Sequence, residues 1–190
     1  MPFSPSFLIR TAWIVTALIW VLSMVFTKPT IKTGSSWMRL LSLTLAIVGG
    51  FCIGDKLLHW GWLAQRFLPH SRNLAFLGAG LTILGCMFAI WARATLGSNW
   101  SAAPGVKQDH VLVQRGPYSM TRHPIYTGFL VAVLGTALAV AQLRAILGFL
   151  FVLSSILLKI SQEEKLMSES FPEDYPRYRN RVRALVPWLL

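Results

Sequence analysis

Long apolar stretches constrain this chain more than any other feature of its sequence. Crossing the hydrocarbon core of a bilayer takes about 20 consecutive apolar residues in a helix. Segments of that kind, or nearly so, are residues 7–26, 39–58, 74–94, 125–141 and 143–160. Charged residues make up 13% of the chain, against about 25% in a soluble domain. The sequence therefore predicts an all-α integral membrane protein with about five transmembrane helices.

The last two apolar stretches are separated only by a few residues around Gln142. Two helices joined by so short a loop form a tight antiparallel hairpin. The start of the 125–141 segment should then lie near the end of the 143–160 segment. We expect two parts in the chain: N-terminal membrane helices (1–73), and a core that contains a long loop, the helical hairpin and a charged tail (74–190).

The distribution of basic residues predicts which side of the membrane carries the polar segments. The net charge is +11, from 18 Lys and Arg against 7 Asp and Glu. Thirteen of the 18 lie in or beside the loop after the first apolar stretch, the loop after the third, and the tail. Because cytoplasmic loops are enriched in Lys and Arg, we expect these segments on the cytoplasmic side. Their placement between apolar runs suits membrane lipids as partners and argues against nucleic acid.

The longest polar stretch, residues 95–124, is the first candidate for a functional segment. Its Gly and Pro residues forbid a continuous helix. Long irregular loops in compact domains are usually functional. We therefore expect this loop to contribute to a site on the cytoplasmic side.

Two clusters of polar residues should meet at that site. Arg122, His123 and Tyr126 begin the fourth apolar stretch, whereas Lys159 and Glu163 end the fifth. Because the hairpin brings these two ends together, we expect the first three side chains to face the other two.

Simpler interpretations explain parts of these clusters. Lys159 and Glu163 are four residues apart and share one helix face, and a surface ion pair of that kind is common and weak. Pro124 after His123 suits an ordinary first helical turn. Neither explains why ionisable groups gather at the edge of a span, where they are costly unless they face a cavity or a partner.

For several other residues, the sequence predicts no role in a catalytic or binding site. Tyr175 and Tyr178 are expected to be membrane-interface aromatics, and the basic run 177–183 a phospholipid contact. Cys52 and Cys86 fall inside apolar stretches and are expected to be small core residues. Because the histidines have no recognisable ligand spacing, no metal site is predicted. The histidines are His59, His70, His110 and His123.

Several motifs carry a resemblance to a known family. They are the loop ending Gly116-Pro117-Tyr118, the Arg122-His-Pro-Ile-Tyr-Thr-Gly128 motif, the pair Glu163-Glu164, and the tail positions Phe171, Tyr175, Tyr178, Val182 and Pro187. With these motifs in order over about its last hundred residues, the sequence resembles the isoprenylcysteine carboxyl methyltransferase family and the related phospholipid N-methyltransferases.

The resemblance implies an S-adenosylmethionine pocket at the cytoplasmic face, capped by the tail, so that 74–190 is a methyltransferase-like core. The positions that match cofactor contacts in the family are His110, Val111, Leu112, Val113, Tyr118, His123, Pro124, Ile125, Tyr126 and Glu163. Glu164 stays an alternative to Glu163. A basic residue one turn earlier contacts the substrate in eukaryotic members. Here it is Lys159 where those members have Arg, which keeps the charge but loses the planar fork.

The acceptor class stays open between several alternatives. A lipophilic carboxylate, such as that of a prenylcysteine-like compound, is already ionised at neutral pH, so Lys159 and Arg122 need only position it. An amine or thiol acceptor, including a phospholipid amine, needs deprotonation, with His123 as the candidate base. Two other classes are an NADPH-dependent enzyme resembling sterol reductases, some of which carry a similar Arg-His-Pro motif, and a non-enzymatic membrane scaffold.

Overall fold

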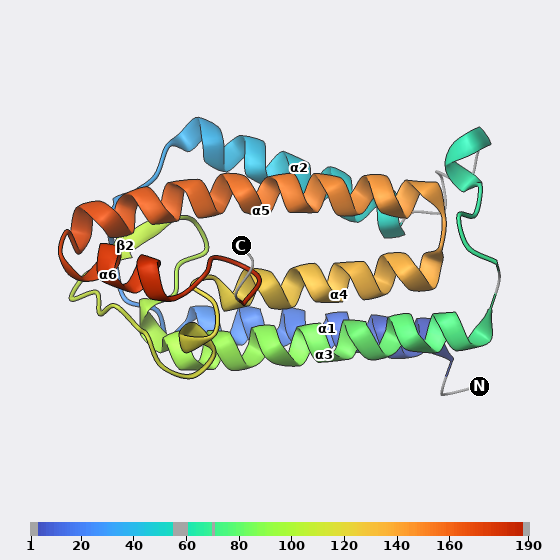
Figure 1. The fold of residues 1–190 in the computed structure, drawn as a ribbon, viewed down its shortest axis with the longest axis horizontal. Helices are drawn as coiled ribbons and strands as arrows, with labels where there is room; N and C mark the ends of the chain where they lie inside the picture. Colours follow the sequence, from blue (N-terminus) through green and yellow to red (C-terminus); the bar gives the residue numbers. More distant parts are fainter. Residues whose placement is uncertain (1–3, 55–60, 70, 188–190) are drawn as a thin grey trace.

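The computed structural model describes residues 4–54, 61–69 and 71–187, and within them the chain is a bundle of long helices (Figure 1). His59 and His70 lie outside the described residues. The helices are α1 (Pro5–Met24), α2 (Ser36–Gly54), α3 (Arg72–Leu96), α4 (Pro124–Val140), α5 (Leu143–Ser170) and α6 (Asp174–Arg181). The shorter elements are the 3-10 turns η2 (Gly61–Ala64), η3 (Gly97–Asn99) and η4 (Gly116–Ser119), and the strands β1 (Thr30–Thr33) and β2 (Gly105–Lys107).

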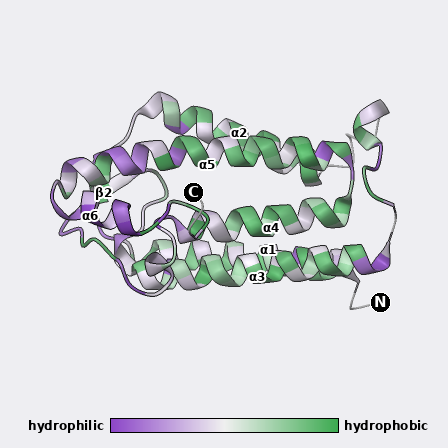
Figure 2. Cartoon of the chain, viewed as in Figure 1, coloured by the Kyte–Doolittle hydropathy of each residue, from purple (hydrophilic) through white to green (hydrophobic). Residues whose placement is uncertain are grey.

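Helices α1, α2, α3 and α5 are each long and apolar enough to cross a membrane. Helix α4 has 17 residues, which makes it about 25 Å long, and it runs alongside the others (Figure 1). Hydrophobic residues cover most of the length of the bundle (Figure 2). The chain is therefore a multi-pass integral membrane protein, and the predicted all-α fold with about five apolar helices is confirmed.

Helix α5 is longer than its apolar stretch predicted. That stretch ends near Ile160, whereas the helix continues to Ser170. No Gly or Pro interrupts the sequence between Ile160 and Pro172, so nothing stops the helix there. As a result, Glu163 and Glu164 stand on a rigid helix rather than in a mobile tail.

Glycines allow the helices to pack closely in two groups. A Cβ at Gly85 of α3 would lie 2.5 Å from the carbonyl oxygen of Gly128 in α4, and one at Gly78 would lie 2.5 Å from that of Gly135. Such small-residue contacts let backbones approach in membrane bundles. Helix α1 also packs on α3, whereas α2 packs mainly on α5. The hairpin of α4 and α5 is consequently open, because each arm has its main packing partner elsewhere.

The turn between α4 and α5 is as short as predicted. Ala141 ends α4 in the left-handed conformation, with φ of 52°. The backbone of Gln142 forms an isolated antiparallel β-bridge with that of Arg66. Arg144, at the start of α5, donates to the carbonyl oxygens of Cys52 and Ile53 at 2.9 and 2.8 Å, which closes the C-terminal end of α2. Cys52 is a buried free cysteine, as is Cys86 in α3. The prediction that both are small core residues is confirmed.

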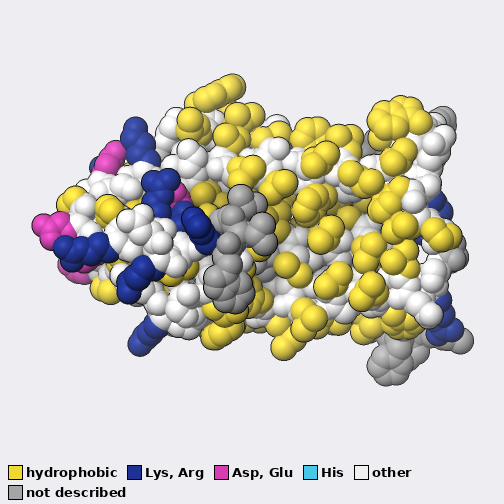
Figure 3. Space-filling model, in the orientation of Figure 1, with side chains coloured by type: hydrophobic (Ala, Val, Ile, Leu, Met, Phe, Trp, Pro, Cys, Tyr) yellow, Lys and Arg dark blue, Asp and Glu magenta, His cyan; other side chains and the backbone are white. Residues whose placement is uncertain are grey.

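The loops that were predicted to lie on one side of the membrane gather at one end of the bundle, which we name the polar end. Strand β1, from the loop after α1, pairs antiparallel with β2, from the loop after α3. Helix α6 and the tail lie at this same end (Figure 1). On the face shown in Figure 3, most Lys, Arg, Asp and Glu side chains cluster at the polar end, whereas hydrophobic side chains cover the middle.

Candidate active site

A cavity opens at the polar end between the long loop, the start of α4, the end of α5 and the tail; we name it the polar cavity. Most of the residues singled out in the sequence line it, namely His110, Val111, Leu112, Val113, Tyr118, Arg122, His123, Ile125, Tyr126 and Glu163. Pro124 does not line the cavity; it is buried in the first turn of α4. The hairpin geometry therefore brings together residues from three separate parts of the sequence.

Glu163 is held by two side chains of α4. The Tyr126 hydroxyl donates to Glu163 Oε1 at 2.5 Å, and His123 Nδ1 lies 3.4 Å from Oε2. The His123 and Tyr126 rings stack with centroids 5.8 Å apart. The Glu163 side chain keeps 26% of its surface exposed. Its carboxylate is thus fixed in direction and still reachable from the cavity.

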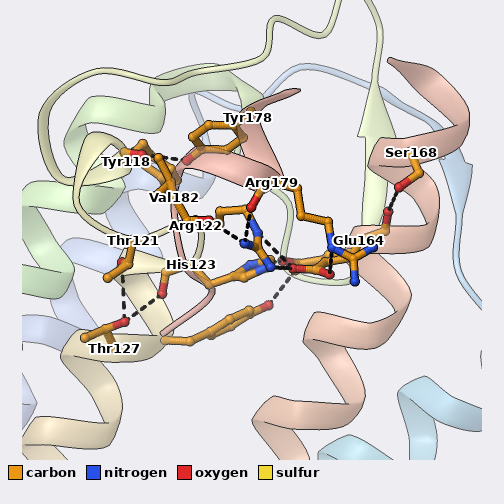
Figure 4. A network of polar contacts seen from close by, with 12 residues as sticks. Tyr118, Thr121, Arg122, His123, Thr127, Glu164, Ser168, Tyr178, Arg179 and Val182 are labelled. Atoms are coloured by element: carbon orange, nitrogen blue, oxygen red, sulfur yellow. Dashed lines mark hydrogen bonds and ion pairs between the residues drawn. The ribbon is translucent and has the colours of Figure 1, made fainter. Parts of the chain in front are cut away.

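Glu164 shares His123 with Glu163, since His123 Nε2 lies 3.4 Å from Glu164 Oε1, but its other partners differ (Figure 4). Arg122 donates through Nε and Nη2 to Glu164 Oε1 at 3.0 and 2.5 Å. Arg179 Nε lies 3.6 Å from Oε2. Glu164 does not line the polar cavity, and its side chain is only 14% exposed. The two adjacent carboxylates therefore point to different tasks, with Glu163 facing the cavity and Glu164 tying α5 to α4 and the tail.

Arg122 lines the cavity but is occupied by structural contacts. Besides Glu164, its guanidinium donates to the carbonyl oxygens of Arg179, at 3.2 Å, and Val182. Arg122 is 8% exposed. These contacts use the guanidinium to hold the tail against the start of α4.

His123 lies between the two carboxylates. Burial lowers the pKa of His123, but hydrogen bonds and charge from Glu163 and Glu164 outweigh burial, and the net pKa is raised above its usual value. A raised pKa favours the imidazolium form, which donates hydrogen bonds and cannot accept a proton.

The tail forms one wall of the polar cavity. The Tyr178 hydroxyl donates to the carbonyl oxygen of Tyr118 at 2.6 Å. Tyr175 and Tyr178 are each 2% exposed, and both line the cavity. The prediction that these two tyrosines are membrane-interface aromatics is therefore wrong. The hydrophobic pattern of the short tail helix gave no signal of this burial, because its partners come from distant parts of the chain.

The loop wall of the cavity is ordered by its own contacts. The backbone N–H of Lys107 donates to His110 Nδ1 at 3.2 Å, and the His110 ring lies 5.8 Å from that of Phe171. Burial, together with the charges of Lys28 and Lys107, lowers the pKa of His110. The lowered pKa favours the neutral form of His110, whereas the raised pKa of His123 favours its protonated form.

A second cavity, which we name the apolar cavity, lies deeper in the bundle among α1, α2, α4 and α5. Its volume is about 560 Å³. Its cationic lining residues are Lys159, from α5, and Arg10, from α1. The residues that line both cavities are Trp100, Ser101, Ile125 and Tyr126. Lys159 thus lines the same cavity as Tyr126, whereas Arg122, His123 and Glu163 line only the polar cavity.

Comparisons with known proteins match part of the sequence. The family model of the isoprenylcysteine carboxyl methyltransferases matches residues 78–169. Over this stretch, just under half of its 190 residues, the chain is similar to this family. A Saccharomyces cerevisiae protein-S-isoprenylcysteine O-methyltransferase is 36% identical over 122 residues, which are 63% of this chain and 51% of the relative. The Tribolium castaneum protein of the same name is 28% identical over 84% of this chain and 52% of its own length.

A bacterial relative carries a different name. The cobalt-zinc-cadmium resistance protein CzcN of Cupriavidus metallidurans is 33% identical over 67% of this chain and 59% of its own length. The match covers about half the length of the first isoprenylcysteine methyltransferase relatives. Within the described residues, no group of three or more His, Cys, Asp or Glu side chains is arranged to hold a metal ion.

The family motifs do not include several residues of the two cavities. Asn99, Trp100, Ser101 and Met167 line one or both of them. Trp100 and its neighbours follow the positive-φ Gly97, whose place after an apolar helix is a stop signal. That signal marks where the helix ends, but it does not reveal that the next residues turn back into the bundle.

Proposed function

We propose that the chain is an S-adenosylmethionine-dependent methyltransferase that acts on a lipophilic carboxylate, such as that of a prenylcysteine-like compound. The observation that carries this proposal is the meeting of two cavities of opposite character. One presents the Glu163 carboxylate, the other is apolar and presents Lys159, and they share the wall formed by Trp100 and Tyr126. The similarity to the isoprenylcysteine carboxyl methyltransferase family supports the same activity.

The polar cavity fits the charged parts of the cofactor. The Glu163 carboxylate would pair with its ammonium group, because a partly buried charge needs a partner. Backbone groups of residues 110–113 would bind the adenine edge, and the faces of Tyr118 and Tyr126 suit a sulfonium. Within the described residues, the buried Tyr175 hydroxyl at this wall makes no hydrogen bond of normal geometry, and such a group suits a polar ligand.

The apolar cavity fits a lipophilic acceptor. Its volume of about 560 Å³ lies within the usual range for ligand sites, roughly 300–1,000 Å³. Lys159, half-buried in its wall, supplies a positive charge for an acceptor carboxylate. We assign Arg122 a supporting role, since its donors already bind Glu164 and the tail.

The chemistry suits an acceptor that is already ionised. When bound, S-adenosylmethionine supplies a methyl group whose transfer to a carboxylate oxygen breaks the carbon–sulfur bond and leaves its electron pair on sulfur. A carboxylate needs no proton removed, so the residues of the chain would act by orientation. The raised pKa of His123 favours its protonated form, which cannot take a proton from an amine or thiol acceptor.

The active site would lie on the cytoplasmic side of the membrane. The polar end carries the loops and tail that hold most of the Lys and Arg residues, and cytoplasmic segments are enriched in these residues.

Radiolabelled methyl transfer tests the proposal directly. Purified protein in detergent receives labelled S-adenosylmethionine with a prenylcysteine, phosphatidylethanolamine or a lipophilic thiol. We expect label in the prenylcysteine ester, and loss of S-adenosylhomocysteine binding by calorimetry in Glu163→Ala. Glu169→Ala is the matched control, since Glu169 lies on the same helix but binds exposed Lys32. Labelling of the amine or the thiol would show that this compound is the acceptor instead. If the protein neither binds S-adenosylhomocysteine nor transfers label to any acceptor, the proposed enzyme activity is refuted.

A further inference from the structure

Trp100 and Ser101 are the residues of the shared wall that stand on no helix, and Trp100 is the larger of the two. Of the residues that line both cavities, Ile125 and Tyr126 stand on α4, and Tyr126 is fixed by Glu163. Trp100 follows the η3 turn in the long loop. It is nevertheless 9% exposed, so other contacts must fix its ring.

Apolar packing in a cluster with Ala92, Tyr118 and Ile125 holds part of the ring, and Arg93, near the end of α3, adds a polar contact. Its guanidinium carbon lies 4.5 Å from the centroid of the Trp100 ring. Its Nη1 and Nη2 donate to the carbonyl oxygens of Gly97 and Ser23, each at 2.8 Å. One side chain therefore connects the end of α1, the turn after α3 and the ring of Trp100. Trp20 of α1 meets the same ring edge-on, with centroids 6.3 Å apart.

Stability alone does not explain a cation at this place. Arg93 is 4% exposed, and the partners found for it in the described part of the chain are carbonyl oxygens and an aromatic ring rather than a carboxylate. Burying a charge is costly, and apolar residues at buried charged positions often leave a protein as stable or more so. What the guanidinium provides is a fixed direction for the ring that it covers.

We infer that Arg93 is a positioning residue for methyl transfer, which holds the Trp100 ring as the wall where the donor and acceptor cavities meet. This inference rests on the proposed function. The free face and edges of the ring then define how the lipophilic acceptor approaches the polar cavity. If the ring turns, both cavities keep most of their lining, but the approach between them is no longer defined.

A spectroscopic test examines the ring without turnover. The emission difference between wild type and Trp100→Phe isolates Trp100 among the 8 tryptophans. The emission of Trp100 in the Arg93→Met background is the difference between Arg93→Met and the Arg93→Met/Trp100→Phe double variant. We expect this difference spectrum to be shifted in wavelength or intensity from the one obtained with wild type. An unchanged difference overturns the inference. If Arg93→Met does not fold, Arg93→Lys, which keeps the charge but not the planar stacking group, is measured in its place.

A double-mutant cycle on methyl transfer tests the consequence. We expect Arg93→Met and Trp100→Ala each to lower kcat by roughly tenfold, with S-adenosylhomocysteine affinity little changed. The double variant should be no slower than Trp100→Ala, because Arg93 acts through that ring. Arg93→Lys should recover part of the loss.

Arg144→Met is the matched control, since Arg144 is also a buried arginine that binds helix-end carbonyls but lines neither cavity. It should lower thermal stability without a selective loss of kcat. If the wild type is active and the two losses of kcat multiply in the double variant, the role of Arg93 is overturned and the proposed function stands. A wild type without binding or transfer overturns the proposed function and the catalytic role of Arg93 together.

Discussion

The Tyr126 hydroxyl donates a 2.5 Å hydrogen bond to Glu163 Oε1 and so connects the first turn of α4 with the polar end of α5. The two helices pack mainly on other partners, and this bond is one of the side-chain contacts that connect them at the polar end. It also links the cofactor site to the wall between the cavities, because Glu163 lines only the polar cavity and Tyr126 lines both.

Lys159→Ala should separate acceptor binding from cofactor binding. Lys159 lines only the apolar cavity, so its loss should raise the KM of a carboxylate acceptor by roughly tenfold or more, the usual effect of losing a charged hydrogen bond. Calorimetry should show S-adenosylhomocysteine affinity unchanged. Lys165→Ala, an exposed lysine on the same helix, should leave both unchanged. A loss of cofactor affinity in Lys159→Ala would place Lys159 in the other site.

The pH dependence of stability should carry the signature of His123. Its pKa is raised because Glu163 and Glu164 outweigh the effect of burial, with Arg122 bound to the same Glu164. A raised pKa stabilises the fold fully below the usual pKa of about 6.5, and this stabilisation is lost as the pH rises through the higher folded value. The unfolding temperature in detergent should therefore fall as the pH rises from about 6.5 through the higher pKa of the folded state. Glu163→Gln should make this fall smaller, and His123→Gln should abolish it. An identical pH profile for His123→Gln would show that His123 is not protonated in the fold.

The sequence predicted the site where helix geometry alone determines it. A short turn at Gln142 forces two apolar helices to end at one surface, so the proximity of His123, Tyr126 and Glu163 followed from spacing. It did not predict Trp100, Tyr175 or Tyr178, because loop and tail residues have no period that reports what they contact. Burial of these residues depends on pairing between segments far apart in the chain, as with Tyr178 and Tyr118.

Counting charges gives an expected orientation, but it does not give the role of each arginine. Arg93 and Arg144 both enter that count, yet both are buried and bind carbonyl oxygens at helix ends. Such arginines have the same sequence context as snorkelling ones, near the end of an apolar stretch. Only the helix packed alongside decides between the two cases, and sequence spacing does not identify that helix.

Tyr178→Phe should loosen the tail that covers the polar cavity. The Tyr178 hydroxyl binds the carbonyl oxygen of Tyr118 in a buried place, and leaving that acceptor unpaired costs about 1–3 kcal/mol. We expect a lower unfolding temperature and weaker S-adenosylhomocysteine binding. Tyr175→Phe removes from the same helix a hydroxyl that makes no hydrogen bond of normal geometry to any described residue, so its effect on the unfolding temperature should be smaller. Equal destabilisation by the two variants would contradict a stabilising role of the hydrogen bond between Tyr178 and Tyr118.

Substitution of alanine for two glycines of α3 should have different effects on the stability of the fold. A Cβ at Gly85 would lie 2.5 Å from the carbonyl oxygen of Gly128, whereas one at Gly80 meets nothing within 4 Å. Gly85→Ala must therefore push α4 away from α3, at a cost of about 1–3 kcal/mol for overpacking. Gly80→Ala removes backbone freedom without a clash and should leave stability unchanged or raise it. Because α4 carries His123 and Tyr126 at its start, displacement of α4 should also weaken cofactor binding in Gly85→Ala. Thermal unfolding and calorimetry of both variants in one detergent test this, and an equally stable Gly85→Ala would show that the helices are not in close backbone contact.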